Sequence, residues 1–258
     1  MCPYIDIFGC QIGTYGLCLV LGFYLVATLA FFRGKPLGFR LEDLAIIAAL
    51  AFGGAFFGGG ILYAFVTYPV DQIIAFIKQG DLSFLVSGIV FYGGLIGGIL
   101  GVLLGIHMTG SGLDTVVHCI VPFVPLGHAV GRIGCVMSGC CHGFAYDGMF
   151  ALYYPKSLLG LSPEQGYFPV QPLESLVNIG ICFVLLRLEK KMKHPTGLLF
   201  LYLGLYSVAR FFLEMLRGDA IRGGWNGLST SQYISITLLG VSLNGFLWTG
   251  RCARSRKG

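Results

Sequence analysis

Four charged side chains, Arg132, Glu174, Arg210 and Glu214, stand inside long apolar segments, where charge is costly and therefore usually functional. Arg210 and Glu214 are four residues apart, so they share one face of a helix, and Arg217 extends that face. A guanidinium group stays charged when desolvated and can hold phosphate oxygens by two parallel hydrogen bonds. These residues therefore predict a binding site for a lipid phosphate near a membrane surface.

Depth in the membrane supports the same interpretation. Tyr15 and Tyr92 lie near the starts of two further apolar segments, and chain direction alternates from one span to the next. Measured from the segment ends, both tyrosines and the four charged residues fall in the same outer half of the membrane. A plainer alternative for the Arg210, Glu214 and Arg217 face is an internal ion pair with an interfacial anchor.

The elements that must position these residues are membrane-spanning helices. Hydrophobic residues make up 55% of the 258 residues and charged residues 11%, where a soluble domain carries about 25% charged residues. We expect an all-α membrane protein in which each span needs roughly 20 apolar residues. The seven expected spans are residues 12–32, 44–66, 87–106, 114–140, 172–188, 196–216 and 231–248.

Orientation follows from the positions of lysine and arginine. They concentrate in residues 33–40, 187–193 and 251–257, which places the N-terminus outside and the C-terminus in the cytoplasm. The net charge of +5 then reflects membrane topology, and nucleic-acid binding is a poor interpretation of it. Residues 1–258 are expected to form a single polytopic domain, with an amphipathic outer helix near residues 69–87 and a small outer cap at residues 143–171.

Glycine is abundant, with 40 residues, and it is concentrated in the expected spans. It recurs every fourth residue from Gly93 to Gly105, and Gly54 and Gly58 repeat the pattern in the preceding span. A helix face without side chains lets a neighbouring backbone approach closely. The spacing therefore predicts tight packing between helices.

Cysteines gather at the end of the fourth expected span, at Cys135, Cys140 and Cys141. The favoured hypothesis is a structural disulfide, with Cys2 or Cys10 from the outer N-terminus as a partner. Zinc binding is less favoured because the spacing lacks the usual paired ligands. A reactive thiol that accepts an acyl or alkyl group is a further alternative.

Over nearly its whole length the sequence resembles the prolipoprotein diacylglyceryl transferase family. The most specific matches are the Gly131-Arg132-Ile133-Gly134 run and the pattern formed by Arg210, Phe211, Glu214 and Arg217. The other matches are Tyr15-Gly16-Leu17, Gly93-Gly94-Leu95-Ile96-Gly97, Pro125-Leu126-Gly127, Pro169 and Gln171 with Glu174, Leu205 to Ala209, and Ser231-Gln232-Tyr233.

The resemblance implies a seven-span enzyme of the bacterial cytoplasmic (inner) membrane, with its active site toward the periplasmic or outer side. Such enzymes transfer the diacylglyceryl group of phosphatidylglycerol to the lipobox cysteine thiol of a preprolipoprotein and release glycerol phosphate. The implied partners are phosphatidylglycerol, the preprolipoprotein signal peptide and the lipid bilayer. The resemblance implies neither a cofactor nor a metal.

The resemblance implies that Arg132 and Arg210 are the phospholipid-binding and catalytic residues. We expect Tyr92 and Glu214 to join them in catalysis. The residues that we expect to bind substrate are Tyr15, Gly93, Gly94, Gly131, Glu174, Gln171, Arg217, Cys135 and His142.

The sequence departs from the family pattern at several of these positions. Tyr92 stands where the family usually has histidine, and tyrosine titrates near pH 10, which makes it a poor base at neutral pH. Cys135 and residues 138–142 replace the usual Asn and Asn-Gly-Glu run, and Phe56 and Phe57 stand where an arginine is usual. His128 and His142 are possible substitutes for the missing histidine.

These departures keep other functions open. The same phospholipid site could serve a different thiol or hydroxyl acceptor. A membrane thiol-redox or metal-binding protein could instead use Cys135, Cys140 and Cys141. Transport is the weakest hypothesis, because no charged residue lies clearly in the inner half of a span.

Overall fold

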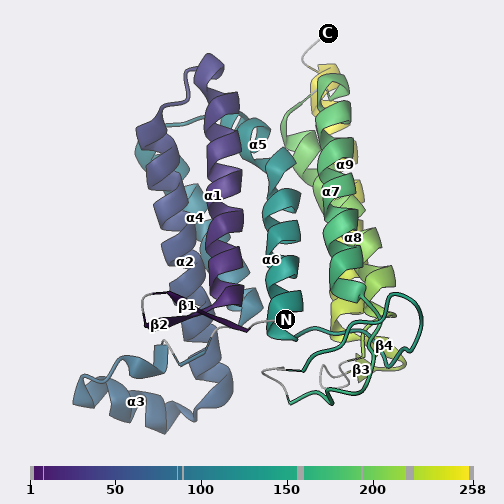
Figure 1. Cartoon of the computed structure of the whole chain (residues 1–258). Coiled ribbons are helices and arrows are strands. Elements are labelled where there is room, and N and C mark those ends of the chain that lie inside the picture. Colours follow the sequence, from purple (N-terminus) through teal and green to yellow (C-terminus); the bar gives the residue numbers. More distant parts are fainter. Residues whose placement is uncertain are drawn as a thin grey trace. The chain divides into compact units, whose positions relative to one another are not determined.

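The computed structural model of the chain describes residues 3–7, 9–85, 87–88, 90–155, 160–192, 194–218 and 224–255 (Figure 1). The backbone groups into two compact units, one of residues 1–30 and 117–258 and the other of residues 31–116. Helix α1 (Thr14–Gly34) begins in the first unit, and α5 (Leu113–Ile120) ends in it.

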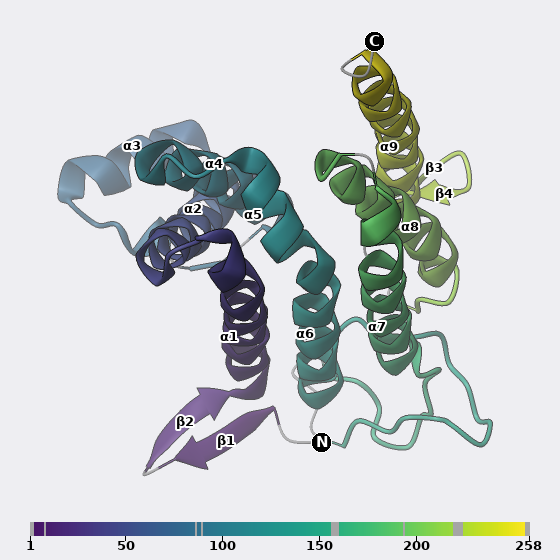
Figure 2. The ribbon, with the colours of Figure 1, turned by 90° about the horizontal axis from the view of Figure 1, so that it is seen from above.

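The first unit is a set of packed helices. Its main helices are α6 (Val124–Ser138), α7 (Val170–Leu188), α8 (Thr196–Glu214) and α9 (Thr230–Ser255), with short 3-10 turns η3 (Val121–Phe123) and η4 (Glu189–Lys191). Helix α6 packs on α7, α7 on α8 and α8 on α9, and these helices lie side by side in both ribbon views (Figures 1 and 2). A buried cluster of Val117, Val121, Ile181, Leu185 and Leu198 joins η3, α7 and α8.

Helix α1 approaches α6 through glycines. A Cβ atom added at Gly22 would lie 2.8 Å from the carbonyl oxygen of Gly127, and one at Gly134 would lie 3.2 Å from Cα of Tyr15. Side chains at these points would force the helices apart. The contact holds Tyr15, in the first turn of α1, beside the C-terminal half of α6.

The fourth expected span is one membrane-crossing segment, Leu113–Ser138, but it is not one continuous helix. It consists of α5, η3 and α6, with Pro122 inside η3 and Pro125 in the first turn of α6. Proline donates no backbone hydrogen bond and interrupts a helix interior. The segment therefore changes from α-helix to a 3-10 turn and back.

The described part of the first unit also contains two small antiparallel hairpins, which were not predicted from the sequence. Strand β1 (Tyr4–Ile7) pairs with β2 (Cys10–Gly13), and β3 (Gly224–Trp225) pairs with β4 (Leu228–Ser229). The second hairpin turns at Asn226 and Gly227, whose φ values of 51° and 83° are those of a type I′ turn.

Residues 143–169 form an irregular segment that we call the aromatic loop; its residues 156–159 are outside the described part (Figure 2). Backbone hydrogen bonds close it on itself, from Tyr146 to Gly166 at 2.8 Å and from Leu152 to Tyr167 at 2.9 Å. The rings of Phe144 and Phe168 stack at 5.2 Å. The expected outer cap at residues 143–171 thus corresponds to this irregular segment and the first two residues of α7, and its position outside the membrane stays a prediction.

The second unit is built on α2 (Leu41–Thr67) and α4 (Phe91–Thr109), which pack along their length. The turns η1 (Lys35–Leu37) and η2 (Ser83–Leu85) and the short helix α3 complete it. Helix α3 (Val70–Gln79), expected near residues 69–87, follows Pro69 and ends at Gly80 with φ of 70°. Its buried Ile73 clusters with Ala64 and Phe84, whereas the neighbouring Ile74 and Ile77 are exposed. Exposed isoleucines beside a buried one fit a helix that lies in a membrane interface.

The glycine faces of α2 and α4 meet as predicted. A Cβ atom at Gly97 would lie 2.0 Å from the carbonyl oxygen of Gly54, and one at Gly58 would lie 2.4 Å from that of Gly93. Real Cβ atoms are never found at such distances, so backbone touches backbone here. Glycine is required along this contact.

We therefore expect Gly97→Ala to lower the thermal unfolding midpoint of the protein in detergent micelles. Overpacking costs about 1 to 3 kcal/mol, which outweighs the roughly 1 kcal/mol that alanine gains in helix propensity. Gly53→Ala is the matched control on α2, since nothing lies within 4 Å of its added Cβ atom. An equal midpoint for the two variants would contradict a requirement for glycine.

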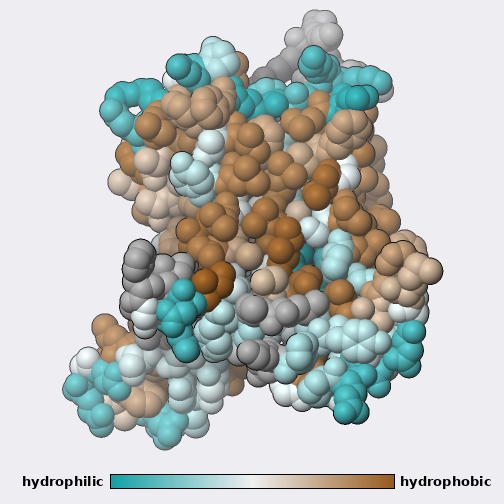
Figure 3. All heavy atoms as spheres, in the orientation of Figure 1, coloured by the Kyte–Doolittle hydropathy of each residue, from teal (hydrophilic) through white to brown (hydrophobic). Residues whose placement is uncertain are grey.

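Six segments among the described residues are long and apolar enough to cross a membrane: Thr14–Leu37, Leu41–Thr67, Tyr92–Thr109, Leu113–Ser138, Val170–Lys191 and Thr196–Glu214. In the space-filling view, apolar side chains cover the middle of the helices and hydrophilic ones gather toward their ends (Figure 3). Helix α9, expected to be the seventh span, is long enough but is not among these six, because hydroxyl and amide side chains such as Gln232, Ser235 and Asn244 lower its hydropathy.

Candidate functional site

Four charged residues from three helices of the first unit form one ion-pair network. Arg132 Nη2 on α6 lies 2.9 Å from Glu174 Oε1 on α7. Arg210 Nη1 on α8 lies 3.9 Å from Glu174 Oε2, and Arg210 Nη2 lies 2.5 Å from Glu214 Oε2 one turn later. Glu174 thus joins the two arginines, and the predicted meeting of Arg132 and Arg210 is found in the structure.

The network is nearly dry. The side chain of Glu174 is 1% exposed, and those of Arg132 and Arg210 are 14% and 11% exposed. Two guanidinium and two carboxylate groups also balance in formal charge. Attraction between such groups is strong where water is excluded, and a buried charge without its partner is destabilising.

Two donors of the network are unused. Among the described residues, Arg132 Nε and Arg210 Nη1 have no hydrogen-bond acceptor although both atoms are buried. Buried polar groups are nearly always hydrogen-bonded, so each exception requires an explanation. Oxygen atoms of an anionic ligand would supply the missing acceptors.

The start of α9 completes the network through Ser229, Ser231 and Gln232, none of which was among the predicted site residues. The Gln232 N–H donates to Ser229 Oγ at 3.3 Å, and the Ser229 N–H donates to Gln232 Oε1 at 2.9 Å. This is a capping box, in which serine and glutamine satisfy each other's backbone donors. Ser229 Oγ also donates to Glu214 Oε1 at 3.1 Å, and Arg210 Nη2 donates to Ser231 Oγ at 3.3 Å.

Helix α7 is fixed against α6 close to the network. Ser175 Oγ, one residue after Glu174, donates to the carbonyl oxygen of Ala129 at 2.9 Å. Asn178 Nδ2 donates to the carbonyl oxygen of Glu174 at 2.8 Å. The bond from Ser175 joins the two helices and so restricts the rotation of α7 beside Glu174, whereas the bond from Asn178 lies within α7.

Two other predicted site residues lie beside α6. Tyr15 is 43% exposed and packs where Gly134 leaves room for α1. Gly131 is buried, and a Cβ atom there would be in ordinary contact with Leu19 at 3.5 Å. The contact with Leu19 therefore does not require glycine at position 131, and the expected role of Gly131 in substrate binding stays a prediction.

Tyr92, Gly93 and Gly94 belong to the second unit, in the first turn of α4. Tyr92 is 38% exposed. Gly93 packs against Gly58 of α2, and a Cβ atom at Gly94 would lie 3.2 Å from the carbonyl oxygen of Ala55. Both glycines thus serve the helix contact within that unit.

The two histidines considered as bases occupy different surroundings. The His128 ring lies on α6 one turn before Arg132, with its centroid 5.0 Å from that of Tyr206 on α8. The His142 ring packs edge to face on Tyr167 of the aromatic loop at 4.8 Å, and its Nδ1 is 2.9 Å from the carbonyl oxygen of Gly143. His128 is the closer of the two, along the chain, to an arginine of the network.

Gln171 joins the aromatic loop to the end of α6. Its side chain is buried, and Nε2 donates to the carbonyl oxygen of Cys140 and to the hydroxyl of Tyr154, both at 2.9 Å. Burial raises the pKa of Tyr154 to about 12, so this hydroxyl stays protonated at neutral pH. The Gln171 amide thus connects the aromatic loop to the end of α6. The expected role of Gln171 in substrate binding remains a prediction.

Tyr154→Phe should lower the free energy of unfolding by about 1 to 3 kcal/mol, because it leaves a buried amide N–H of Gln171 without an acceptor. The neighbouring Tyr153→Phe is the control, since that side chain is 48% exposed. Chemical denaturation in micelles compares the two. Superimposable curves would show that the hydroxyl of Tyr154 contributes nothing to stability.

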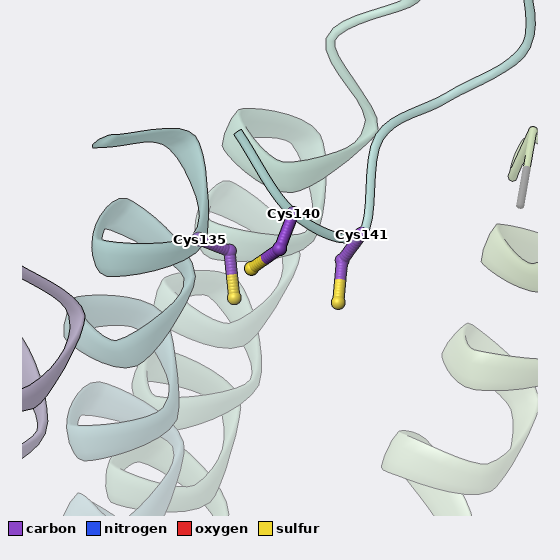
Figure 4. A group of neighbouring side chains, drawn as sticks. All are labelled: Cys135, Cys140 and Cys141. Atoms are coloured by element: carbon purple, nitrogen blue, oxygen red, sulfur yellow. The ribbon is translucent and has the colours of Figure 1, made fainter. Parts of the chain in front are cut away.

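The cysteine cluster lies where α6 ends, and its three Sγ atoms are within 4.8 Å of one another (Figure 4). Cys135 and Cys140 are free thiols, so the favoured disulfide hypothesis is wrong for them; the side chains of Cys2 and Cys10 lie outside the described residues. The Sγ of Cys135 is 3.9 Å from Nη1 of Arg132.

The cluster is also electrostatically linked to Arg217. Hydrogen bonds from Cys135 and Cys140, together with the charge of Arg217, hold the pKa of the Cys141 thiol below its usual value. The same hydrogen bonding raises the pKa of the Cys140 thiol. The backbone of Arg217 pairs with Gly143, which brings the end of α8 to the start of the aromatic loop.

Comparison with known proteins gives a consistent result. A family model described as "Prolipoprotein diacylglyceryl transferase" matches residues 3–248. The chain is 32% identical over 237 residues to phosphatidylglycerol–prolipoprotein diacylglyceryl transferase 2 of Clostridium perfringens, covering 91% of this chain and 90% of that protein. It is 31% identical over 231 residues to the phosphatidylglycerol–prolipoprotein diacylglyceryl transferase of Clostridium tetani, covering 90% of each.

Proposed function

Because the chain belongs to the prolipoprotein diacylglyceryl transferase family, we propose that it transfers the diacylglyceryl group of phosphatidylglycerol to the lipobox cysteine thiol of a preprolipoprotein. The observation that carries this proposal is the meeting of Arg132 and Arg210 on Glu174 in a dry site. Each arginine keeps one buried N–H that no described residue accepts. A lipid phosphate supplies charge and acceptors of the required geometry.

In the proposed reaction the sulfur of the acceptor thiol attacks the glycerol carbon that carries the phosphate ester, and the thiol proton passes to a phosphate oxygen of the leaving group. A carbon–sulfur bond forms, the carbon–oxygen bond to the phosphate breaks, and glycerol phosphate leaves with that electron pair. Negative charge grows on the leaving oxygens, where the fixed guanidinium groups of Arg132 and Arg210 stabilise it. Glu174 and Glu214 are positioning residues that hold these groups in place.

We assign the remaining predicted residues of the first unit to the rim of this site; they are Tyr15, Gly131, Cys135, Arg217, His142 and Gln171. Tyr92, Gly93 and Gly94 belong to the second unit, and their expected roles in catalysis and substrate binding stay predictions.

The proposed location is the bacterial cytoplasmic (inner) membrane, with the site toward its outer, periplasmic face. Lysine and arginine at residues 33–40, 187–193 and 251–257 support a cytoplasmic position for these connections. A chain with its N-terminus outside and its C-terminus in the cytoplasm crosses the membrane an odd number of times. We propose α9 as the seventh span. The whole chain then forms one membrane domain.

The test uses purified protein in micelles with phosphatidylglycerol labelled in its head-group glycerol and a lipobox peptide. We expect labelled glycerol phosphate to be released and the peptide to gain the mass of a diacylglyceryl group. A peptide with serine in place of the lipobox cysteine is the control. Release without any gain in peptide mass would contradict the proposed acceptor.

A cell-based experiment separates the proposed acceptor from a different one. The gene is expressed in bacteria depleted of their own transferase. Restored lipoprotein maturation is expected and would argue against a different thiol or hydroxyl acceptor. Failure to restore it, together with phosphatidylglycerol turnover by the purified protein, would favour that alternative.

A further inference from the structure

The three thiols at the end of α6 are brought together by the way that helix ends. The Cys140 N–H donates to the carbonyl oxygen of Cys135 at 3.1 Å, and the Gly139 N–H donates to that of Val136 at 3.3 Å. With Gly139 at φ of 70°, these bonds form a Schellman motif. In this motif the residue after the glycine packs on the residue five positions earlier, so here two sulfurs take the place of the usual apolar pair.

Cys141 is directed to the same place by a conformation that a cysteine rarely adopts. Its φ is 57°, in the left-handed region that side chains other than those of Gly, Asn and Asp disfavour. Such backbone strain persists where surrounding structure imposes it, and it clusters at functional sites. Gln171 fixes the preceding carbonyl, that of Cys140, by a hydrogen bond of 2.9 Å. In the close-up, Cys140 points toward the sulfur of Cys135, and Cys141 extends to the same side (Figure 4).

We propose that Cys135, Cys140 and Cys141 form a binding site for one soft monovalent metal ion, Cu(I), held by three thiolates. The sequence alone did not favour a metal here, since Cys-x₄-Cys-Cys lacks the usual paired spacing. A metal–sulfur bond of about 2.3 Å places three sulfurs about 4 Å apart around a trigonal ion. The observed limit of 4.8 Å is therefore within a small side-chain rotation of that geometry.

Ligand number selects the ion. Thiolates favour Cu(I) and zinc among the common metals. Zinc normally takes four ligands, and among the described histidine and carboxylate atoms none joins the three sulfurs. The nearby His142 is packed on Tyr167, with Nδ1 next to the carbonyl oxygen of Gly143. Three thiolates suffice for Cu(I).

Positive groups lie beside the three sulfurs. Arg132 Nη1 is 3.9 Å from Cys135 Sγ, although the charge of Arg132 is already balanced within the ion-pair network, and Arg217 acts electrostatically on Cys141. A neighbouring guanidinium group favours the thiolate form that a metal ion requires. Cys135 is buried whereas Cys140 and Cys141 are partly exposed, so an ion can enter from the side of the loop.

The test measures Cu(I) binding by the reduced full-length protein in micelles, in competition with bicinchoninate and without oxygen. We expect one Cu(I) per chain and near-ultraviolet absorption from sulfur-to-copper charge transfer. Cys140→Ser should weaken binding by at least about 100-fold, more than the loss of an outer-shell partner causes. Cys182→Ser on α7 is the matched control and should bind like the parent protein.

A measurement on the unmutated chain guards against variants that fail to fold. Cu(I) should protect Cys140 and Cys141 from alkylation by N-ethylmaleimide, as peptide mass spectrometry would show. Equal alkylation with and without Cu(I) would overturn the proposal. So would equal Cu(I) affinity in folded Cys140→Ser protein, or retention of Zn(II) at one per chain in preference to Cu(I). None of these readouts depends on transferase activity.

Discussion

Replacing Arg210 by alanine is expected to lower the rate of diacylglyceryl transfer by about 10²- to 10³-fold, the usual cost of removing one fixed donor to a developing negative charge. Arg210 suits this role because Glu214 and Ser231 hold its Nη2 while its buried Nη1 has no hydrogen-bond acceptor among the described residues. The rate is measured as labelled glycerol phosphate released in the presence of a lipobox peptide. Arg132→Ala should cause a loss of the same size.

Two further variants show whether this loss is specific to the guanidinium group of Arg210. Arg210→Lys keeps the charge but lacks the planar fork, so its rate should fall between those of the parent and the alanine variant. Arg40→Ala removes an exposed arginine that pairs with Glu42 in the other unit, and it should leave the rate unchanged. If Arg210→Ala were as active as Arg40→Ala, the assigned role of Arg210 would be wrong.

The second large effect is on stability. Glu174→Gln should lower the free energy of unfolding by about 3 to 5 kcal/mol, the typical cost of breaking a buried ion pair by removing one partner. The carboxylate is 1% exposed and lies within ion-pair distance of both Arg132 and Arg210, so its neutralisation leaves two buried positive charges facing only Glu214. Chemical denaturation in micelles, followed by circular dichroism, measures the change.

Glu164→Gln is the matched control, because it makes the same chemical change on an exposed side chain of the aromatic loop. Its unfolding curve should match that of the parent protein. Combining Glu174→Gln with Arg132→Met should cost less than the sum of the two single changes, since residues in one charge network are not additive. Simple additivity would show that Arg132 and Glu174 do not depend on each other.

Much of the fold was predictable because hydrophobic length alone determines a membrane helix. The segment expected at residues 196–216 is α8, Thr196–Glu214, and that expected at residues 172–188 lies within α7. The glycine face from Gly93 to Gly105 was also predictable, because residues four apart lie on the same face of an α-helix.

The partners within the site were less predictable. The depth of a residue in the membrane could be estimated from its distance to the end of its span. This estimate placed Arg132, Glu174 and Arg210 at a similar depth. Which carboxylate faces which arginine depends on how each helix is rotated, and that depends on contacts between spans. The hydrogen bond from Ser175 to Ala129 is one such contact, and nothing in the local sequence indicates it.

Other features of the site could have been predicted from short sequence patterns. The Asn226-Gly227 pair is typical of a two-residue hairpin turn, and Ser229 with Gln232 has the spacing of a capping box. The second pattern would have placed Ser229 at the start of α9. Gly139 likewise marks the end of α6, and its position explains how cysteines with unusual spacing come together.

The double use of the Ser229 hydroxyl has a mechanical consequence. The same oxygen accepts the Gln232 N–H that starts α9 and donates to Glu214. A bound anion that draws Arg210 away from Glu214 frees that carboxylate to turn, and the turn pulls on the first residues of α9. Fraying of this helix end and rearrangement of the charged groups are therefore a single coupled event, which amide exchange at Gln232 would report.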